Sequence, residues 1–216
     1  MKIDNMKLLL RGLIPSIVIK RIGDLKRSVE RNRNHERSAE EVFTRIYQKN
    51  LWGGRTGEFC LGAGTSNNKI VSDYVSTISL QASLLDFEGK TFVDLGYGDF
   101  RVGKQLLSLC SMYIGIYVVK PLILFNKKKF GDNHTKFMNL DIVEDDFPEG
   151  DVCFIRQVFQ HLSNKQITQV LGKLNNFKYV LITEHYPTDN NSIKTNIDKI
   201  HGGDIRVYQN SGVYLS

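Results

Sequence analysis

Between residues 91 and 183, short runs of apolar residues alternate with stretches in which apolar residues recur every three or four positions. The first pattern predicts buried β-strands and the second predicts amphipathic helices. We predict strands at 91–95, 112–118, 136–140, 151–155 and 179–183, and helices at 101–110, 121–130 and 163–174. Because strands alternate with helices, we expect an α/β protein with a Rossmann-like, doubly wound and mostly parallel sheet covered by helices on both faces.

The residues before this alternation predict helices. Ser38 followed by Glu41 is typical of a helix start with a capping box. A glycine-rich connector spans 51–66, and another helix is expected at 69–85 with Thr65 or Ser66 as its cap. We therefore divide the chain into a basic helical N-terminal extension, residues 1–50, and a domain of residues 51–216. Two short closing strands are expected at 205–208 and 212–215.

Composition places the chain among ordinary globular proteins. The hydrophobic share is 41% and the charged share is 24% in 216 residues. Three scattered cysteines, Cys60, Cys110 and Cys153, argue against a disulfide framework and against a cysteine zinc site. The histidines show no HxH or HExxH spacing, so we expect no metal. A reducing cytoplasm is the simplest location for such a chain.

Charge is distributed unevenly along the chain. Residues 1–50 hold 12 basic and 6 acidic residues, whereas the remaining residues are balanced at 17 of each. A basic arm of this kind suits an anionic membrane surface or a nucleic acid. Residues 1–35 also contain an apolar set that predicts peripheral contact with a membrane, formed by Met6, Leu9, Leu10, Leu13, Ile17 and Ile22. We consider nucleic acid the weaker alternative because the body has no basic surplus.

The turn after the first strand carries the candidate chemistry. Its sequence, Asp94-Leu-Gly96-Tyr-Gly98-Asp99, departs from the dinucleotide pattern GxGxxG because Arg101 stands where the third glycine belongs. Glycines in such a turn let a ligand approach the backbone. Two carboxylates suit a cofactor with a sulfonium and an amino group better than a pyrophosphate. The turn therefore favours S-adenosylmethionine over NAD.

With these residues, the chain resembles the class I S-adenosylmethionine-dependent methyltransferases, in particular small bacterial members, over about residues 50–215. The segments that carry the resemblance are Asp94–Phe100, Tyr113–Val119, Leu140–Ile142 and Asp151–Leu162. The resemblance implies that S-adenosylmethionine is the cofactor and that methyl transfer is the reaction.

The resemblance also implies roles for individual residues. Asp94, the loop Gly96-Tyr97-Gly98 and Asp99 would surround the methionine part of the cofactor. Tyr117 and Val118 would lie near the ribose. Asp141 would bind the adenine amino group and the Ile142 N–H a ring nitrogen. The floor near the transferred methyl would be formed by Arg156 and Gln157.

Two positions depart from the family pattern. Position 97 is usually small and position 117 is usually acidic, but both are tyrosine here. A carboxylate that binds both ribose hydroxyls is replaced by one phenol, which costs on the order of 2–4 kcal/mol, or roughly 30- to 1000-fold in affinity. We therefore expect weakened cofactor binding, unless the two rings recover part of the loss by stacking on the cofactor.

Residues for the methyl acceptor are expected after the fourth and fifth strands and near the C-terminus. The candidate catalytic residues are His161, His185 and Asp204, with Glu184 and His201 as further candidate bases. We expect the acceptor to be a small molecule or a glycan. The alternatives are a non-catalytic Rossmann-like protein whose pocket is filled by Tyr97 and Tyr117, and a nucleic-acid methyltransferase that uses the basic arm.

Overall fold

A computed structural model describes residues 16–54, 59–60, 62–188 and 192–215. The chain forms two compact units, Met1–Arg37 and Ser38–Ser216, which we describe separately. The boundary lies earlier than the expected one at residue 50. The reason is that α3 (Ala39–Gln48) buries Val42, Phe43 and Ile46 in the core of the second unit.

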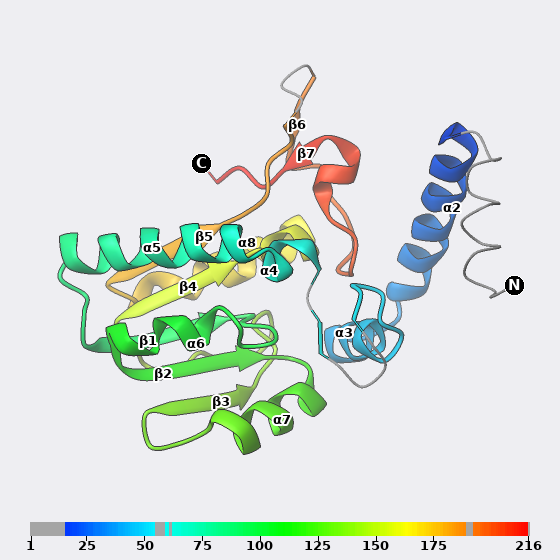
Figure 1. Ribbon diagram of the computed structural model, residues 1–216. Helices are drawn as coiled ribbons and strands as arrows, with labels where there is room; N and C mark the ends of the chain where they lie inside the picture. The colour runs from blue at the N-terminus through cyan, green and yellow to red at the C-terminus, as the bar shows by residue number, and fades with distance from the viewer. Residues whose placement is uncertain (1–15, 55–58, 61, 189–191, 216) are drawn as a thin grey trace, which may run out of the picture. The chain divides into compact units, whose positions relative to one another are not determined.

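Five parallel strands form the central sheet in the order β3-β2-β1-β4-β5 (Figure 1). Their bounds are β1 (Lys90–Leu95), β2 (Cys110–Tyr117), β3 (Thr135–Asn139), β4 (Val152–Arg156) and β5 (Tyr179–Thr183). The order reverses between β1 and β4, as in a doubly wound sheet. The expected Rossmann-like α/β fold is confirmed.

Side chains of alternate residues on the strands pack on opposite faces of the sheet. Phe92 and Phe154 lie in a cluster with α3, α5 (Asn68–Leu84) and α7 (Lys120–Phe130). Val93 and Ile155 lie in a second cluster, together with Ile167 and Val170 of α8 (Asn164–Gly172). Successive side chains of a strand point to opposite faces of the sheet. Both faces carry apolar side chains here, and helices cover both.

Several short elements complete the second unit. They are α4 (Ala63–Ser66), α6 (Gly103–Leu106), β6 (Lys194–Thr195), β7 (Ser211–Gly212) and the 3₁₀ turns η1 (Leu107–Leu109), η2 (Phe159–His161), η3 (Leu174–Asn176) and η4 (Arg206–Gln209). The expected helix at 101–110 is therefore shorter than predicted, because β2 already begins at Cys110.

Two helix starts differ in how well the sequence predicted them. Ser38 accepts a hydrogen bond from the Glu41 N–H and Glu41 bonds back to Ser38, so the predicted capping box is confirmed. The cap of α5 is Asn67, whose Oδ1 accepts from the Lys69 and Ile70 N–H groups, and not Thr65 or Ser66. An asparagine side chain reaches these donors from the residue directly before the helix.

The expected strand at 205–208 is wrong. This segment forms the turn η4, and β7 covers only Ser211–Gly212, where it pairs with β6 in parallel. Arg206 explains the difference, because its side chain is buried and bonds to the carbonyls of Ile197 and Phe159. Those bonds draw residue 206 inward and bend the chain instead of leaving it extended.

Candidate functional site

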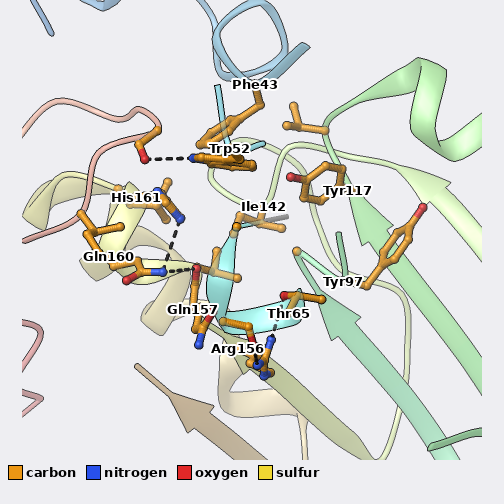
Figure 2. A pocket seen from close by; sticks show the side chains of 18 of the residues that line it. Phe43, Trp52, Thr65, Tyr97, Tyr117, Ile142, Arg156, Gln157, Gln160 and His161 are labelled. Atoms are coloured by element: carbon orange, nitrogen blue, oxygen red, sulfur yellow. Dashed lines mark hydrogen bonds between the residues drawn. The ribbon is translucent and has the colours of Figure 1, made fainter. Parts of the chain in front are cut away.

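A cavity of about 280 Å³ lies beyond the C-terminal ends of β1, β2 and β4 (Figure 2). In doubly wound folds this edge of the sheet, at the point where strand order reverses, is where ligands bind. In Figure 1 the arrowheads of β1 and β2 end on the side of the sheet where α3 lies. The lining includes Asp94, Gly96, Tyr97, Tyr117, Val118, Asp141, Ile142, Arg156, Gln157, His161 and His185, all expected from the sequence.

Asp94 occupies the last but one position of β1 and is almost fully buried. Its Oδ2 accepts a hydrogen bond of 2.6 Å from the Tyr113 hydroxyl on the neighbouring strand β2. Burial raises the pKa of Asp94 to about 6, although the Tyr113 bond and the charge of Arg156 oppose the rise. A buried carboxylate in a cavity is a favourable partner for a cation.

Gly96 forms the sharp turn after β1 with a φ of +81°. A Cβ at this position would lie 2.5 Å from Cγ2 of Val158. No L residue fits both the left-handed backbone and this close approach, so glycine is required here. The chain therefore leaves the sheet at the cavity edge without placing a side chain into it.

Tyr97, next to this turn, belongs largely to the core. Its ring contacts Phe137 and Phe100, and its hydroxyl accepts a hydrogen bond of 3.4 Å from Asn126. Space for the ring comes from Gly115 on β2, where a Cβ would lie 2.7 Å from Tyr97 Cδ1. The side chain of Tyr97 points away from the centre of the cavity in Figure 2, so it does not fill the pocket.

The next two expected cofactor residues, Gly98 and Asp99, are not part of the lining. Gly98 has a φ of +65° and continues the turn behind Tyr97. The Asp99 carboxylate accepts the Arg101 N–H at 3.1 Å and lies 3.8 Å from the Arg101 guanidinium. The cofactor contact expected of these two residues stays a prediction, and Asp99 Oδ1 caps its own turn.

Tyr117 ends β2 at the ribose position expected from the resemblance. Its hydroxyl lies 3.0 Å from the Tyr47 hydroxyl of α3, and both side chains are buried. Burial raises the pKa of both phenols, so both are neutral donors and acceptors at physiological pH. The Tyr47 hydroxyl is thus a hydrogen-bond partner of Tyr117 at the position where the family usually has a carboxylate. Tyr47 was not predicted from the sequence.

Leu140, Asp141 and Ile142 follow β3 and line the cavity next to Val118. Asp141 Oδ1 accepts a hydrogen bond of 2.9 Å from the Val143 N–H, which fixes the carboxylate in the turn. The adenine role of Asp141 and Ile142 remains a prediction, and their place in the cavity is compatible with it.

Arg156 ends β4 and holds a segment of chain across the cavity. Its Nη2 donates to the Gly64 carbonyl at 2.8 Å and its Nη1 to Thr65 Oγ1 at 3.4 Å. The guanidinium also lies 5.1 Å from the centre of the Tyr74 ring. The cavity thus has a fixed positive charge from β4 and a carboxylate, Asp94, from the adjacent strand β1.

Behind Arg156, a chain of polar side chains runs along the floor. Gln157 Nε2 lies 2.9 Å from His185 Nε2, and His185 Nδ1 lies 3.3 Å from Gln160 Oε1. Because Oε1 accepts only, His185 Nδ1 carries the proton and Nε2 accepts. Burial and the charge of Arg156 lower the pKa of His185, which keeps it neutral. Both its nitrogens are engaged, so His185 positions Gln157 and Gln160.

Glu184, directly after β5, supports this floor. Its carboxylate accepts the N–H groups of Phe159 and Gln160 at the start of η2. Burial raises the pKa of Glu184 to about 7, against the effect of these hydrogen bonds. Glu184 is not in the cavity lining, and its two hydrogen bonds hold η2 in place.

His161 lies at the end of η2 below the Trp52 ring, with ring centres 5.2 Å apart (Figure 2). Its Nδ1 lies 2.9 Å from the Gly202 carbonyl, so this nitrogen carries the proton. Its Nε2 then has a lone pair, which lies 3.4 Å from Gln160 Nε2. Burial, with the charge of Lys199, lowers the pKa of His161 to about 3, so the ring is neutral.

An aromatic wall adjoins His161. The Phe43 ring of α3 is 6.0 Å from the Trp52 ring and meets His161 edge-on. Trp52 donates its Nε1 proton to the Gly203 carbonyl at 3.1 Å, which links it to the C-terminal segment. Sequence reasoning missed Phe43 and Trp52. The available signal was the only tryptophan of the chain, placed directly before Gly53-Gly54.

Two expected acceptor-side residues lie outside the cavity lining. Asp204 forms an ion pair with Lys199, with 3.2 Å between Nζ and Oδ1, although its neighbours Gly203 and Ile205 do line the cavity. His201 contacts Gln166 at 3.4 Å. The catalytic role expected of Asp204 stays a prediction, and its carboxylate is paired with Lys199.

Further residues of the loops and helices around the sheet complete the lining of the cavity. They are Ala39, Gly62, Gly64, Thr65, Tyr74, Val102, Leu140, Val158, Gln160, Leu162, Gly203, Ile205 and Tyr208. Within the described part of the chain, no group of three or more His, Cys, Asp or Glu side chains is placed to hold a metal ion.

No protein-family model matches the chain, and no curated protein matches it. Solved structures with a similar chain path include several methyltransferases. The N-methyltransferase NodS from Bradyrhizobium japonicum WM9 has 16% identity and a TM-score of 0.43 over 50% of this chain and 62% of its own. Coclaurine N-methyltransferase, bound to N-methylheliamine and SAH, has 14% identity and a TM-score of 0.46 over 88% of this chain and 67% of its own.

A third similar structure is phosphoethanolamine N-methyltransferase 1 from Haemonchus contortus, with phosphoethanolamine and S-adenosylhomocysteine bound. It has 14% identity and a TM-score of 0.42, and the match covers 65% of this chain and 38% of that one. This chain thus spans less than two thirds of the NodS and phosphoethanolamine enzymes. The cofactor and the reaction of this chain are argued below from its own residues.

Proposed function

We propose that this protein binds S-adenosylmethionine and transfers its methyl group to a small molecule. The observation that carries the proposal is the pair Asp94 and Arg156, which end adjacent strands and line one cavity. S-adenosylmethionine carries an ammonium, a carboxylate and a sulfonium in its amino-acid part. A carboxylate beside a guanidinium complements such a zwitterion, whereas a dinucleotide phosphate would be repelled by Asp94.

The remaining walls fit the other half of the cofactor. Tyr117, bonded to Tyr47 behind it, offers a neutral hydroxyl at the ribose position, and Asp141 with Ile142 offers hydrogen-bonding groups for a base. The absence of an acid at position 117 still favours weaker binding than a carboxylate would give. The cavity that remains, about 280 Å³, argues against the alternative in which Tyr97 and Tyr117 fill the pocket of a non-catalytic protein.

The acceptor would bind against Phe43 and Trp52, next to His161. Aromatic faces suit a ring, including the apolar face of a sugar, so both a small aromatic molecule and a small glycan remain compatible. A nucleic-acid acceptor is less well supported, because the basic surplus lies in residues 1–50 and not around the cavity.

His161 is the proposed catalytic residue. The acceptor nitrogen or oxygen attacks the methyl carbon, the carbon–sulfur bond breaks, and its electron pair stays on sulfur. His161 Nε2, whose lone pair is set by the bond from Nδ1 to Gly202, accepts a hydrogen bond from the acceptor and orients it. The proton of the acceptor then passes to water, because the lowered pKa makes His161 a weak base. Since the sulfonium is already an activated donor, most of the rate comes from aligning the two reactants.

Calorimetric titration tests cofactor binding. We expect S-adenosylhomocysteine to bind in a one-to-one complex and 5′-methylthioadenosine, which lacks the amino-acid part, to bind at least tenfold more weakly. Arg156→Gln should weaken S-adenosylhomocysteine and leave 5′-methylthioadenosine unchanged. Thr168→Ala, on the exposed side of α8, serves as the matched control. No binding of S-adenosylhomocysteine, or equally tight binding of NAD, would refute the proposal.

A further inference from the structure

Helix α2 (Ser16–Asn34) of the first unit carries an apolar stripe on its surface. Val18, Ile22, Leu25 and Val29 are exposed to 40%, 46%, 67% and 43%. At 3.6 residues per turn these four positions fall within about 60° of one another around the helix axis. The structure therefore presents a narrow apolar face that is exposed along about three turns.

Basic residues flank this stripe on both sides. Arg21 and Arg33 are exposed and lie beyond its two edges around the axis, by roughly 40° and 20° respectively. The helix as a whole holds six basic and two acidic residues. Long basic side chains beside an apolar stripe are typical of helices that lie in a membrane interface, because the apolar face enters the acyl region while the charges meet the headgroups.

Charge distinguishes a lipid surface from a second copy of this chain. Two copies that paired through the stripe would bring two helices of net charge +4 together, which is unfavourable. The apolar repeat also covers only two heptads and contains Gly23, which weakens a coiled coil. An anionic bilayer matches both the apolar face and the charge.

We propose that α2 lies flat on an anionic lipid surface and holds the protein there. Among the described residues, no helix is long and apolar enough to cross a membrane. Of the apolar set expected from the sequence, Met6, Leu9, Leu10 and Leu13 lie outside the described residues, so the proposal rests on the stripe of α2. It does not depend on the proposed methyl transfer.

Vesicle sedimentation of the full chain tests this proposal. Vesicles of phosphatidylcholine alone are compared with vesicles that also contain phosphatidylglycerol. We expect at least tenfold stronger partition to the anionic vesicles, and a loss on raising the salt concentration, because each basic residue near the surface contributes roughly fivefold.

The matched variants are Ile22→Gln/Leu25→Gln on the stripe and Leu80→Gln/Leu84→Gln on α5, whose leucines are exposed to 59% and 69%. Glutamine preserves helix formation and charge, so only the apolar face changes. The α2 variant should lose at least tenfold in partition and the α5 variant should match the wild type. Equal partition of the α2 variant and the wild type would overturn the proposal. The proposal would also be overturned if the wild type did not bind vesicles but formed dimers in analytical ultracentrifugation, and if the α2 variant did not form them. Titration with S-adenosylhomocysteine in solution should be the same for all three proteins, which separates this test from that of the cofactor.

Discussion

The Tyr113 hydroxyl donates a hydrogen bond of 2.6 Å to Asp94 Oδ2 across the pair of strands at the centre of the sheet. This bond stabilises the buried carboxylate of Asp94 with a neutral donor when no cation is bound next to it. Even so, burial dominates, and the pKa of Asp94 stays raised at about 6. The ionised carboxylate of Asp94 therefore lowers the free energy of unfolding, but it provides a negative charge at the site.

Asp94→Asn should separate binding from stability. We expect at least a tenfold loss of affinity for S-adenosylmethionine, since the partner of the ammonium is gone. At pH 8 the variant should be more stable, by up to about 3 kcal/mol, because a pKa raised by about two units corresponds to that cost of ionisation. Calorimetry and urea unfolding measure the two effects. A variant that is less stable and binds normally would contradict this role.

The pH dependence follows from the same group. The folded protein holds a proton on Asp94 up to about pH 6, whereas an unfolded chain releases it near pH 4. The free energy of unfolding should therefore fall as the pH rises through this window, and Glu184 extends the fall to about pH 7. Cofactor affinity should change in the opposite sense and weaken as the pH falls below about 6. Urea unfolding and titrations from pH 5 to pH 8 test both signs, and parallel trends would refute the assignment.

Gly115→Ala should destabilise the fold through Tyr97. The new methyl group would lie 2.7 Å from the Tyr97 ring, and overpacking of this kind typically costs about 1–3 kcal/mol. In a Tyr97→Ala background the same change should cost at least 1 kcal/mol less. Gly172→Ala is the control, because nothing lies within 4 Å of its added methyl group and it lies within helix α8. Additive effects of the two substitutions would show that the ring does not occupy this space.

Tyr117→Asp should strengthen cofactor binding at the expense of stability. A carboxylate at this position offers two charge-assisted bonds to the ribose, with Tyr47 as a donor nearby, so we expect at least a tenfold gain for S-adenosylhomocysteine. The buried charge should lower the free energy of unfolding in the empty protein. Tyr117→Phe, which keeps the ring, controls for packing and should not bind more tightly. Affinity that Tyr117→Asp leaves unchanged would remove the idea that this tyrosine weakens the site.

Local patterns were sufficient for the sheet. The five strands lie within about two residues of their predicted bounds, because each is a short run rich in apolar residues that is bounded by polar residues. The expected strand at 205–208 failed for a tertiary reason: the buried guanidinium of Arg206 reaches carbonyls 9 and 47 residues away in sequence. No local preference of Val207 or Tyr208 competes with those bonds.

Some residues of the candidate site could be predicted from local sequence and others could not. Asp94 and Arg156 could be predicted because each lies at the end of a buried strand, and strand ends converge in a parallel sheet. The direction of the Tyr97 side chain could not be predicted, because it depends on the space left by Gly115, a glycine on another strand. Phe43, Tyr47 and Trp52 could not either, because the position of α3 over the cavity is set by its packing in the core.

The cavity walls come from widely separated parts of the second unit, from Ala39 in α3 to Tyr208 in η4. A ligand that contacts both α3 and the C-terminal segment must be released before either of them can open. Local opening of α3 or of the C-terminal segment then costs the free energy of ligand binding in addition to the free energy of the opening itself. Occupation of the cavity thus acts as a non-covalent cross-link between distant stretches of chain. It slows amide exchange and proteolysis in segments that a ligand hardly touches.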